Sequence, residues 1–242
     1  MPVDEAFTNP RLAATYDVAE GERDDLDAYE AIVDEFGARS VLDIGCGTGE
    51  LACRLARRGI EVAGVDPAAA SIDIARAKDG ANLVTWHIAD GASVPPVGVD
   101  LATMTANVAQ VFVTDEEWRA VLAATHRALR PGGHLVFETR DPARRAWEGW
   151  TREATHEHLA LPDGESVETW CDVTGADGEL VSFRWTNVFE SDGASIVSDS
   201  TLRFRDREQV ERSLADAGFD VVDVREAPDR PALEMVFIAR RP

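Results

Sequence analysis

Lysine is almost absent from this sequence. Lys78 is the only lysine among 242 residues, and 45 acidic residues against 24 lysines and arginines give a formal net charge of −21. Such a negative surface repels nucleic-acid phosphates and anionic lipids. The arginines that could form a local basic patch are Arg140, Arg144, Arg145 and Arg152. We therefore expect neither a nucleic-acid partner nor a membrane partner.

Cysteine is scarce, and long apolar runs are missing. The three cysteines, Cys46, Cys53 and Cys171, show no C-x-x-C spacing, which argues against a disulfide framework or a thiolate metal site. No apolar run approaches the roughly 20 residues of a membrane-spanning helix. The acidic start Met-Pro-Val-Asp-Glu has no signal-peptide pattern. We expect a cytoplasmic protein with one α/β domain and a small insertion.

The chain is organised around residues 40–51, Ser-Val-Leu-Asp-Ile-Gly-Cys-Gly-Thr-Gly-Glu-Leu. Val41, Leu42 and Ile44 form the short apolar run that a buried parallel strand needs. Glycines at alternate positions follow, and then an amphipathic stretch with helical spacing. Because glycine has no Cβ, such a loop can turn sharply and let a ligand approach its backbone. The pattern predicts a strand, a glycine loop and a helix whose N-terminus offers free N–H groups.

The spacing of the glycines separates two kinds of nucleotide-binding loop. Dinucleotide-binding loops follow G-x-G-x-x-G, whereas this loop reads G-x-G-x-G with Asp43 two residues before Gly45. The pattern D-x-G-x-G-x-G resembles motif I of the class I S-adenosylmethionine (SAM) dependent methyltransferases. SAM carries no pyrophosphate, so a loop that lets its methionine part lie against the backbone is sufficient. The alternative is a tight turn in some other α/β domain.

A second acidic residue, Asp66, ends the expected second strand. In Rossmann-like sheets an acid at this place accepts hydrogen bonds from the ribose hydroxyls, and a carboxylate offers two acceptor oxygens to them. Asp66 followed by Pro67 is also a good sequence for a helix N-cap. One residue can serve both purposes.

Other short segments resemble further motifs of the same family. Asp90 follows the expected third strand, where the family has an acid that accepts a hydrogen bond from the adenine amino group; an ordinary Asp-Gly turn is the alternative. Residues 129–133, Leu-Arg-Pro-Gly-Gly, resemble the L-x-P-G-G turn before the fifth strand. Tyr16-Asp17 resembles a Tyr-Asp pair whose tyrosine lies over the cofactor; a tyrosine packed under a helix is the alternative.

The segment 105–110, after the fourth strand, is expected to face both cofactor and substrate, because ligands bind beyond the carboxyl ends of parallel strands. It lacks the N-P-P-Y or D-P-P-Y motif of DNA amino-methyltransferases. Carried over residue by residue, the resemblance implies that SAM is bound by Tyr16, Asp43, Gly45, Cys46, Gly47, Asp66, Pro67, Ala68, Ala89, Asp90, Gly91, Ala106 and Asn107.

The patterns predict the order of helices and strands. Expected helices span 5–19, 24–36, 48–58, 68–78, 115–129 and 206–217, and expected core strands span 41–44, 60–65, 83–88, 99–105, 134–139, 219–224 and 233–239. The resemblance implies a Rossmann-like α/β fold with a seven-stranded sheet, mostly parallel with the last strand antiparallel, and helices on both faces. We assign 1–39 to N-terminal helices over the active site, and 40–140 with 205–242 to the SAM-binding core.

Residues 141–204 are expected to form an inserted β-layer. An irregular stretch, 141–164, precedes three runs rich in β-formers at 166–174, 179–190 and 194–204. Turn signals at 175–178 and 191–193 separate these runs. The insertion resembles the β-layer that roofs the substrate pocket of sugar-amine N-methyltransferases and glycine N-methyltransferase, where it sometimes mediates dimerisation. A substrate roof, a dimer contact and a homodimer are the corresponding expectations.

Residues that touch the acceptor are harder to assign. Gln110, Arg140 and Trp147 are candidates, the arginine because it can clamp an anionic group; a loop cap, a surface ion pair and core packing are the respective alternatives. Candidate bases are His126, Glu138, Asp141, His156 and His158, and none stands in a recognisable catalytic spacing. The pair His156-x-His158 does not suffice for a metal site, so no metal is expected.

The sequence therefore favours SAM-dependent methyl transfer to a small-molecule acceptor by in-line displacement, in which the protein mainly positions the acceptor. Whether nitrogen or oxygen accepts the methyl group stays open, since an amine can arrive neutral and a hydroxyl usually needs a base. The alternatives are a SAM-binding regulatory or scaffold protein without transferase activity and, less favoured by the acidic composition, an RNA methyltransferase. The glycine spacing argues against a dehydrogenase.

Overall fold

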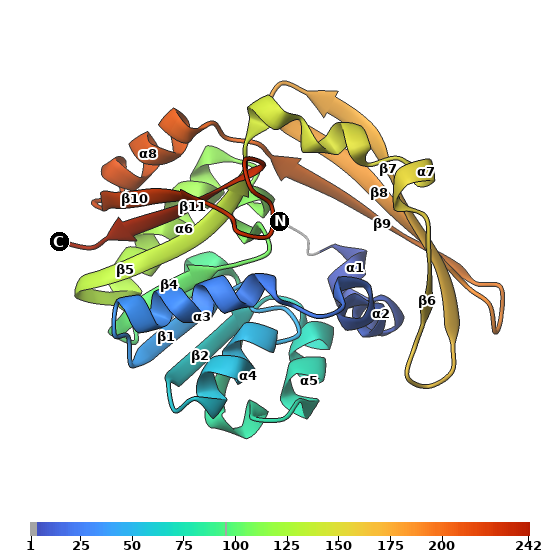
Figure 1. Ribbon diagram of the computed structural model, residues 1–242, viewed down its shortest axis with the longest axis horizontal. Coiled ribbons are helices and arrows are strands. Elements are labelled where there is room, and N and C mark those ends of the chain that lie inside the picture. The colour runs from blue at the N-terminus through green and yellow to red at the C-terminus, as the bar shows by residue number, and fades with distance from the viewer. Residues whose placement is uncertain (1–3, 95) are drawn as a thin grey trace.

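A computed structural model of the protein describes residues 4–94 and 96–242. Its main element is a seven-stranded sheet in the order β10-β11-β5-β4-β1-β2-β3 (Figure 1). The strand β11 runs antiparallel to both of its neighbours, β10 and β5, whereas the strands β1 to β5 pair with one another in parallel. This architecture confirms the predicted fold class. The seven strands are β1 (Ser40–Ile44), β2 (Glu61–Asp66), β3 (Val84–Ile88), β4 (Val99–Met104), β5 (Leu129–Arg140), β10 (Asp220–Glu226) and β11 (Glu234–Arg240).

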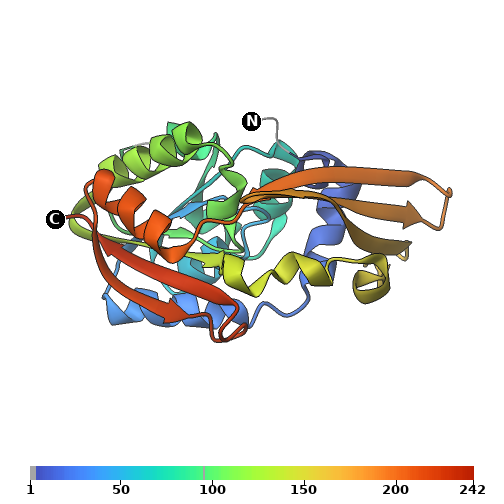
Figure 2. The ribbon, with the colours of Figure 1, turned by 90° about the horizontal axis from the view of Figure 1, so that it is seen from above.

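Helices cover both faces of this sheet, as Figure 2 shows from above. They are α3 (Asp25–Glu35), α4 (Glu50–Arg57), α5 (Ala69–Ala77), α6 (Asp115–Ala128) and α8 (Arg207–Asp216), with short 3-10 turns η1 (Ala81–Leu83), η2 (Gly91–Ser93) and η3 (Val108–Val111) between them. Alternate residues of β1 feed two hydrophobic clusters. Val41 packs with α3 and α4, whereas Leu42 and Ile44 pack with α6 and α8. Burial on both faces explains the continuous apolar run in its sequence.

The strand β5 is longer than predicted. It begins at Leu129 instead of His134, because the expected Pro-Gly-Gly turn is extended backbone that contains a register shift against β4. Gly132 adopts the positive φ of 79° that this irregularity needs.

The N-terminal segment forms two helices where the sequence predicted one over 5–19. The helix α1 (Glu5–Thr8) ends at Asn9, and α2 (Pro10–Glu20) starts directly after it. The side chain of Asn9 accepts a hydrogen bond from the Arg11 N–H, which makes Asn9 an N-cap. Pro10 occupies the first helical position, where its missing N–H costs nothing. The Asn-Pro pair is therefore a helix start inside the apolar pattern.

The insertion is a separate antiparallel sheet in the order β6-β7-β8-β9, with β6 (Glu157–Ala160), β7 (Ser166–Asp177), β8 (Leu180–Phe189) and β9 (Ser195–Arg203). The prediction of three strands missed β6, because in its four residues only Leu159 is buried and no alternation is visible. The expected irregular stretch also holds η4 (Pro142–Arg144), η5 (Ala146–Gly149) and α7 (Arg152–Thr155). The predicted turn at 175–178 starts later than expected: β7 continues to Asp177, with a register shift near Gly175, and the chain reverses at Gly178 and Glu179.

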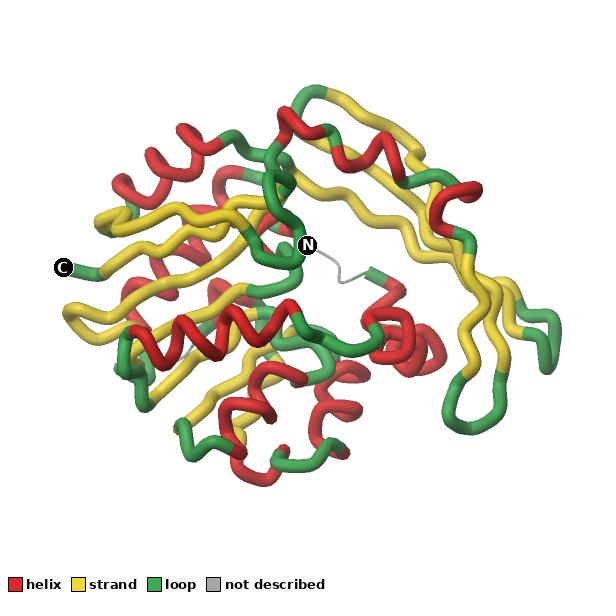
Figure 3. The backbone as a smooth tube through the Cα atoms, viewed as in Figure 1, coloured by secondary structure: helices red, strands yellow, loops and turns green. Residues whose placement is uncertain are grey.

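The N-terminal helices link the inserted sheet to the core. Leu12 of α2 packs with Leu159, Leu161, Val167 and Phe189 in a hydrophobic cluster of the inserted sheet. Residues of α1 and α2 also contact α5 on the core side. Figure 3 shows the loops at the carboxyl ends of the core strands gathered beside these helices. The segment 4–20 therefore lies next to the edge of the sheet where ligands are expected.

Within the described ranges, no helix has the length and apolar character needed to cross a membrane. Over the same residues, no group of three or more histidine, cysteine, aspartate or glutamate side chains is arranged to hold a metal ion.

Candidate active site

The glycine loop after β1 is shaped by left-handed backbone at alternate positions. Gly45 has a φ of 69°, and a Cβ there would lie 2.6 Å from the Val108 side chain. Gly47 has a φ of 52°, but a Cβ there would meet no atom within 4 Å. Gly45 is thus required for packing against η3, whereas Gly47 borders open space. The loop therefore has one tightly packed side and one side that a ligand can approach.

Asp66 fixes this loop in place. The Gly47 N–H donates to Asp66 Oδ2 at 2.9 Å, and the Ala68 N–H donates to Oδ1 at 2.8 Å. Its side chain is buried, and burial raises its pKa. The N-cap of α5 is Ala68, so the alternative N-cap role for Asp66 is wrong, and Pro67 precedes the helix. Each carboxylate oxygen keeps a lone pair for a further donor, so ribose binding by Asp66 stays a prediction.

Asp43 lies beneath the same loop. It is 1% exposed, accepts a hydrogen bond from Thr103 Oγ1 at 2.8 Å, and has its pKa raised by burial to about 7. Asp43 lines a cavity together with Tyr16, Arg23, Leu26, Gly45, Cys46, Gly47, Thr48, Glu50, Leu51, Thr105 and Ala106. The structure thus brings the predicted residues Tyr16, Asp43, Gly45, Cys46, Gly47 and Ala106 around one cavity. The burial of the Tyr16 hydroxyl raises its pKa.

A second cavity of about 80 Å³ adjoins the first, since Tyr16, Arg23 and Ala106 line both. Its walls come from the α2–α3 connection, α3, the loop after β4, the end of β5 and the start of β11. Besides the shared residues it is lined by Glu20, Asp25, Tyr29, Asn107, Glu138, Arg140, Asp229, Arg230 and Glu234. Almost all of these side chains are polar, and Tyr29, Asn107, Glu138 and Glu234 among them are buried.

The backbone after β4 is strained where it meets this cavity. Ala106 and Asn107 have φ values of 55° and 61°, a conformation that costs about 1–3 kcal/mol for a residue other than glycine. The Asn107 N–H donates to Glu138 Oε1 at 3.0 Å, and Asn107 Nδ2 donates to Glu234 Oε1 at 3.1 Å. These bonds from β5 and β11 hold the loop in its strained form. Strain maintained in this way is typical of functional sites.

Glu138 is the candidate base that the structure places in this wall. It is 5% exposed, and its pKa is raised to about 8, mainly by burial and further by Glu234 and Asp25, although the Asn107 N–H opposes the shift. The other candidates lie elsewhere: His126 packs against Phe219 and Asp141 caps η4. His156 and His158 lie on the insertion, where they pair with Glu168 and Glu190.

The predicted acceptor residues separate into two groups. Arg140 Nη1 donates to Gln110 Oε1 at 3.0 Å, and Arg140 Nε lies 3.6 Å from Glu234 Oε1, so its ion-pair partner is a buried carboxylate. Trp147 instead packs edge-on against Phe204, with a centroid distance of 4.5 Å. The structure therefore joins Gln110 to Arg140, which lines the cavity, while Trp147 contacts Phe204, directly after β9, and Arg145.

The segment 89–91 lies after β3. Asp90 is exposed and accepts hydrogen bonds from the Ala92 and Ser93 N–H groups at 3.0 and 2.9 Å, as the N-cap of η2. A Cβ on Gly91 would lie 2.8 Å from Val121. The local turn is thus observed, and contacts of Ala89, Asp90 and Gly91 to adenine stay a prediction.

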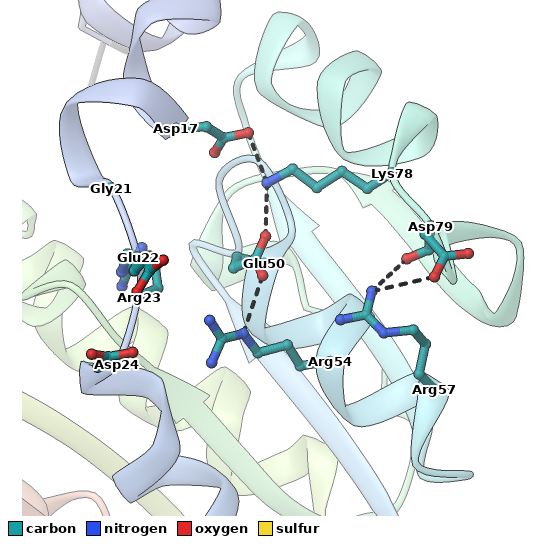
Figure 4. A pocket seen from close by; sticks show the side chains of 10 residues that line it. All are labelled: Asp17, Gly21, Glu22, Arg23, Asp24, Glu50, Arg54, Arg57, Lys78 and Asp79. Carbon is teal, nitrogen blue, oxygen red and sulfur yellow. Dashed lines mark hydrogen bonds and ion pairs between the residues drawn. The ribbon is translucent and has the colours of Figure 1, made fainter.

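The single lysine connects the N-terminal helices to the glycine loop (Figure 4). Lys78 Nζ lies 2.8 Å from Asp17 Oδ2 and 3.1 Å from Glu50 Oε2, and Thr48 Oγ1 donates to Asp17. We call Asp17, Thr48, Glu50 and Lys78 the lysine clasp. It borders a larger cavity of about 520 Å³, whose lining is mostly charged side chains. The clasp joins α2, the glycine loop, α4 and the end of α5.

Several residues that line these cavities belong to no sequence motif. Arg23 lies between two helices and belongs to no motif, yet it lines both cavities and donates twice to Asp25 at 2.8 Å. Tyr29 is a buried residue of α3 and belongs to no motif. Glu234 begins the edge strand β11, and no spacing relates it to Glu138. Only their positions in the fold bring these residues together.

Three features agree with the motifs of SAM-dependent methyltransferases. They are the order of the seven strands, the D-x-G-x-G-x-G loop and the acid at the end of β2. Residues 41–133 match the family model described as a methyltransferase domain. The match covers only this part of the chain, and solved structures of SAM-dependent methyltransferases share the fold of nearly the whole chain.

Individual relatives extend this similarity. The chain is 30% identical over 148 residues to the ubiquinone biosynthesis O-methyltransferase of Idiomarina loihiensis, covering 55% of this chain and 59% of the relative. It spans about half the length of the curated relatives that it matches. The CcbJ methyltransferase of Streptomyces caelestis shares the fold with a TM-score of 0.76 at 21% identity, covering 99% of both chains. A sugar N-methyltransferase from a Streptoalloteichus species has a TM-score of 0.75 at 20% identity, covering 93% of this chain and 90% of that one.

Proposed function

We propose that this protein transfers a methyl group from SAM to a small-molecule acceptor. The proposal rests on two adjoining cavities at the edge of the sheet where the carboxyl ends of the parallel strands lie. The cavity at the glycine loop and the polar cavity at Glu138 share Tyr16, Arg23 and Ala106. A cofactor in the first would therefore lie next to an acceptor group in the second.

The residues of the first cavity fit SAM. The open side of Gly47 leaves room for a ligand against the backbone, and Asp66 is held so that its oxygens can accept hydrogen bonds from two hydroxyls. Asp90 would accept from the adenine amino group, and Arg23 would face the carboxylate of the methionine end. SAM supplies an already activated methyl group on a sulfonium.

The protein's contribution is then placement and exclusion of water. Holding acceptor and methyl carbon about 3–3.5 Å apart can supply roughly 7–11 kcal/mol of the barrier. The N-terminal helices support this role, because they lie beside the edge and are tied to the glycine loop by the lysine clasp. The inserted sheet, whose cluster includes Leu12, supports α2 from the other side and so acts as the roof of the site.

An experiment separates this proposal from its two rivals. The protein is incubated with tritium-labelled SAM and, separately, with a metabolite extract, total RNA and a protein extract of the source cells. We expect label to move into the metabolite fraction alone, and Gly45→Ala to abolish it. Label in RNA would support an RNA methyltransferase. SAM binding without transfer to any fraction would support a binding or scaffold protein and contradict our proposal.

A further inference from the structure

We propose that the acceptor is an amine, that the cavity between α3, β5 and β11 binds its ammonium form, and that Glu138 removes the proton before methyl transfer. This inference rests on the proposed function, because it assigns the acceptor of the same site. Neither the family nor the relatives decide it, since an O-methyltransferase and an N-methyltransferase are both similar to this chain.

The first observation is a pair of buried acceptors without partners. Tyr29 is 5% exposed and Asn107 is 2% exposed. Tyr29 Oη and Asn107 Oδ1 have no hydrogen-bond partner among the described residues, and both residues line this cavity. An unsatisfied buried polar atom costs about 1–3 kcal/mol, and native proteins contain few of them. Two such atoms in one cavity point to a ligand that donates hydrogen bonds.

The second observation is the orientation of these acceptors. Asn107 Nδ2 is bound to Glu234, so the amide presents its oxygen, which can only accept. Glu138 Oε1 accepts from the Asn107 N–H, and no described residue donates to the other carboxylate oxygen. Tyr29, Asn107 and Glu138 thus offer three free acceptor positions. An ammonium group presents three donors, whereas a hydroxyl presents one.

The charges around the cavity favour a cation. Five carboxyl groups line it, at Glu20, Asp25, Glu138, Asp229 and Glu234, against three arginines. The arginines are already paired: Arg23 with Asp25, Arg230 with Glu234 and Arg140 with Gln110 and Glu234. Even with Glu138 protonated, the carboxylates of Glu20, Asp25, Asp229 and Glu234 outnumber the three arginines, so an incoming ammonium would meet an excess of negative charge. A cavity of about 80 Å³ has room for such a head group, with the rest of the acceptor outside it.

Glu138 is suited to take the proton. The pKa of Glu138 is raised to about 8, mainly by burial and further by Glu234 of β11 and Asp25 of α3, whereas the Asn107 N–H and Arg230 oppose the shift. The raised pKa lies nearer to that of an alkyl ammonium, about 10.4, than the pKa of an ordinary carboxyl group does, which lowers the cost of proton transfer. Transfer of one N–H proton to the carboxylate leaves a free electron pair on nitrogen. The nitrogen then bonds to the methyl carbon as the carbon–sulfur bond breaks, and the positive charge moves from sulfur to nitrogen.

The first test is calorimetric titration of matched probes in the presence of saturating S-adenosylhomocysteine. The pairs are glucosamine and glucose, cyclohexylamine and cyclohexanol, and 2-phenylethylamine and 2-phenylethanol. We expect the amine of at least one pair to bind at least about tenfold more tightly than its alcohol, since hydrogen bonds to charged groups are lost with the alcohol. Glu138→Gln should reduce this preference to near parity. Glu61→Gln removes an exposed carboxylate at the start of β2, outside the cavity, and should keep the preference.

The second test follows the proton. At pH 7 Glu138 is largely protonated, so binding an ammonium beside it must release a proton. Titrating the best amine in two buffers of different ionisation enthalpy should show about one proton released by the wild type, and none by Glu138→Gln. The other charged groups facing Glu138 are Glu234, Asp25, Arg230 and Arg140, and Glu61→Gln leaves them unchanged.

Tyr29→Phe separates a binding role from a structural one. Because its hydroxyl has no partner, removing it should raise or leave unchanged the melting temperature, yet weaken binding of the same amine several-fold. No preference for any amine, or a preference that survives both Glu138→Gln and Tyr29→Phe, would overturn the inference. S-adenosylhomocysteine binding in those titrations distinguishes the failures: if it is retained, only the amine assignment fails, and if it is absent, the proposed function fails as well.

Discussion

The two halves of the site differ in how the chain builds them. The centre of the cofactor half is one continuous strand–loop–helix–strand unit, from Asp43 to Asp66, and its geometry depends on backbone conformation at the glycines. The acceptor half is assembled from α3, the loop after β4, β5 and β11. Its geometry depends on buried side chains that meet only in the folded protein. The first half is therefore visible as a motif, and the second is not.

The largest expected effect comes from Gly45→Ala in the cofactor half. The added Cβ combines a positive φ with a 2.6 Å contact to Val108, which should lower the free energy of unfolding by about 2–5 kcal/mol. Chemical denaturation measures this change. Gly47→Ala is the control, because its Cβ meets open space. We expect this variant to lower the free energy of unfolding by about 1–2 kcal/mol, from the positive φ alone. Equal losses in the two variants would contradict the packing argument, whereas Val108→Ala should partly rescue Gly45→Ala.

A pH-dependent effect should follow from Asp43. Its pKa of about 7 in the folded protein lies above the ordinary value of about 4. The folded state therefore holds a proton that the unfolded state loses, and this contribution to stability disappears as the pH rises from about 4 to 7. Relative to the wild type, Asp43→Asn should gain about 2 kcal/mol of stability between pH 5 and pH 7. Denaturation at the two pH values measures it, and an unchanged difference would show that Asp43 is ionised in the folded protein.

The lysine clasp should have a smaller effect, because Asp17 and Glu50 are partly exposed. We expect Lys78→Met to cost about 0.5–1 kcal/mol and to speed hydrogen exchange in α1 and α2, with SAM affinity falling a few-fold. The matched control is Arg76→Met, which removes an exposed pair with Asp73 on the same helix. If both variants behave alike, the clasp does not hold the N-terminal helices.

The smallest effect is expected at Asp90. Asp90→Ala removes an exposed cap from η2 and one proposed hydrogen bond to adenine, so SAM affinity should fall less than tenfold. Asp90→Asn keeps an acceptor oxygen and should retain most of the affinity. Titration of SAM into both variants checks this. A loss as large as that of a change at Asp66 would mean that the adenine end carries more binding energy than the ribose end.

The contrast between local motifs and side chains that meet only in the folded protein also explains which features could be predicted from the sequence. The core strands, the glycine loop and Asp66 were accessible because their patterns are local. The strand β6 and the break at Asn9 were missed, since one is too short to show alternation and the other continues an apolar stripe. Glu138 could be named only as one acid among several. Its raised pKa depends on burial and on Glu234 and Asp25, which lie far from it in sequence and form no motif with it.

The most direct test of the account is calorimetric titration of SAM, S-adenosylhomocysteine and NADH into the wild type and Asp66→Ala. We predict that the wild type binds SAM and S-adenosylhomocysteine but not NADH, and that Asp66→Ala weakens both by about 1–3 kcal/mol through the hydrogen bonds lost to ribose and to the Gly47 N–H. Binding of NADH, or SAM binding that Asp66→Ala leaves unchanged, would contradict the assignment of the cofactor half.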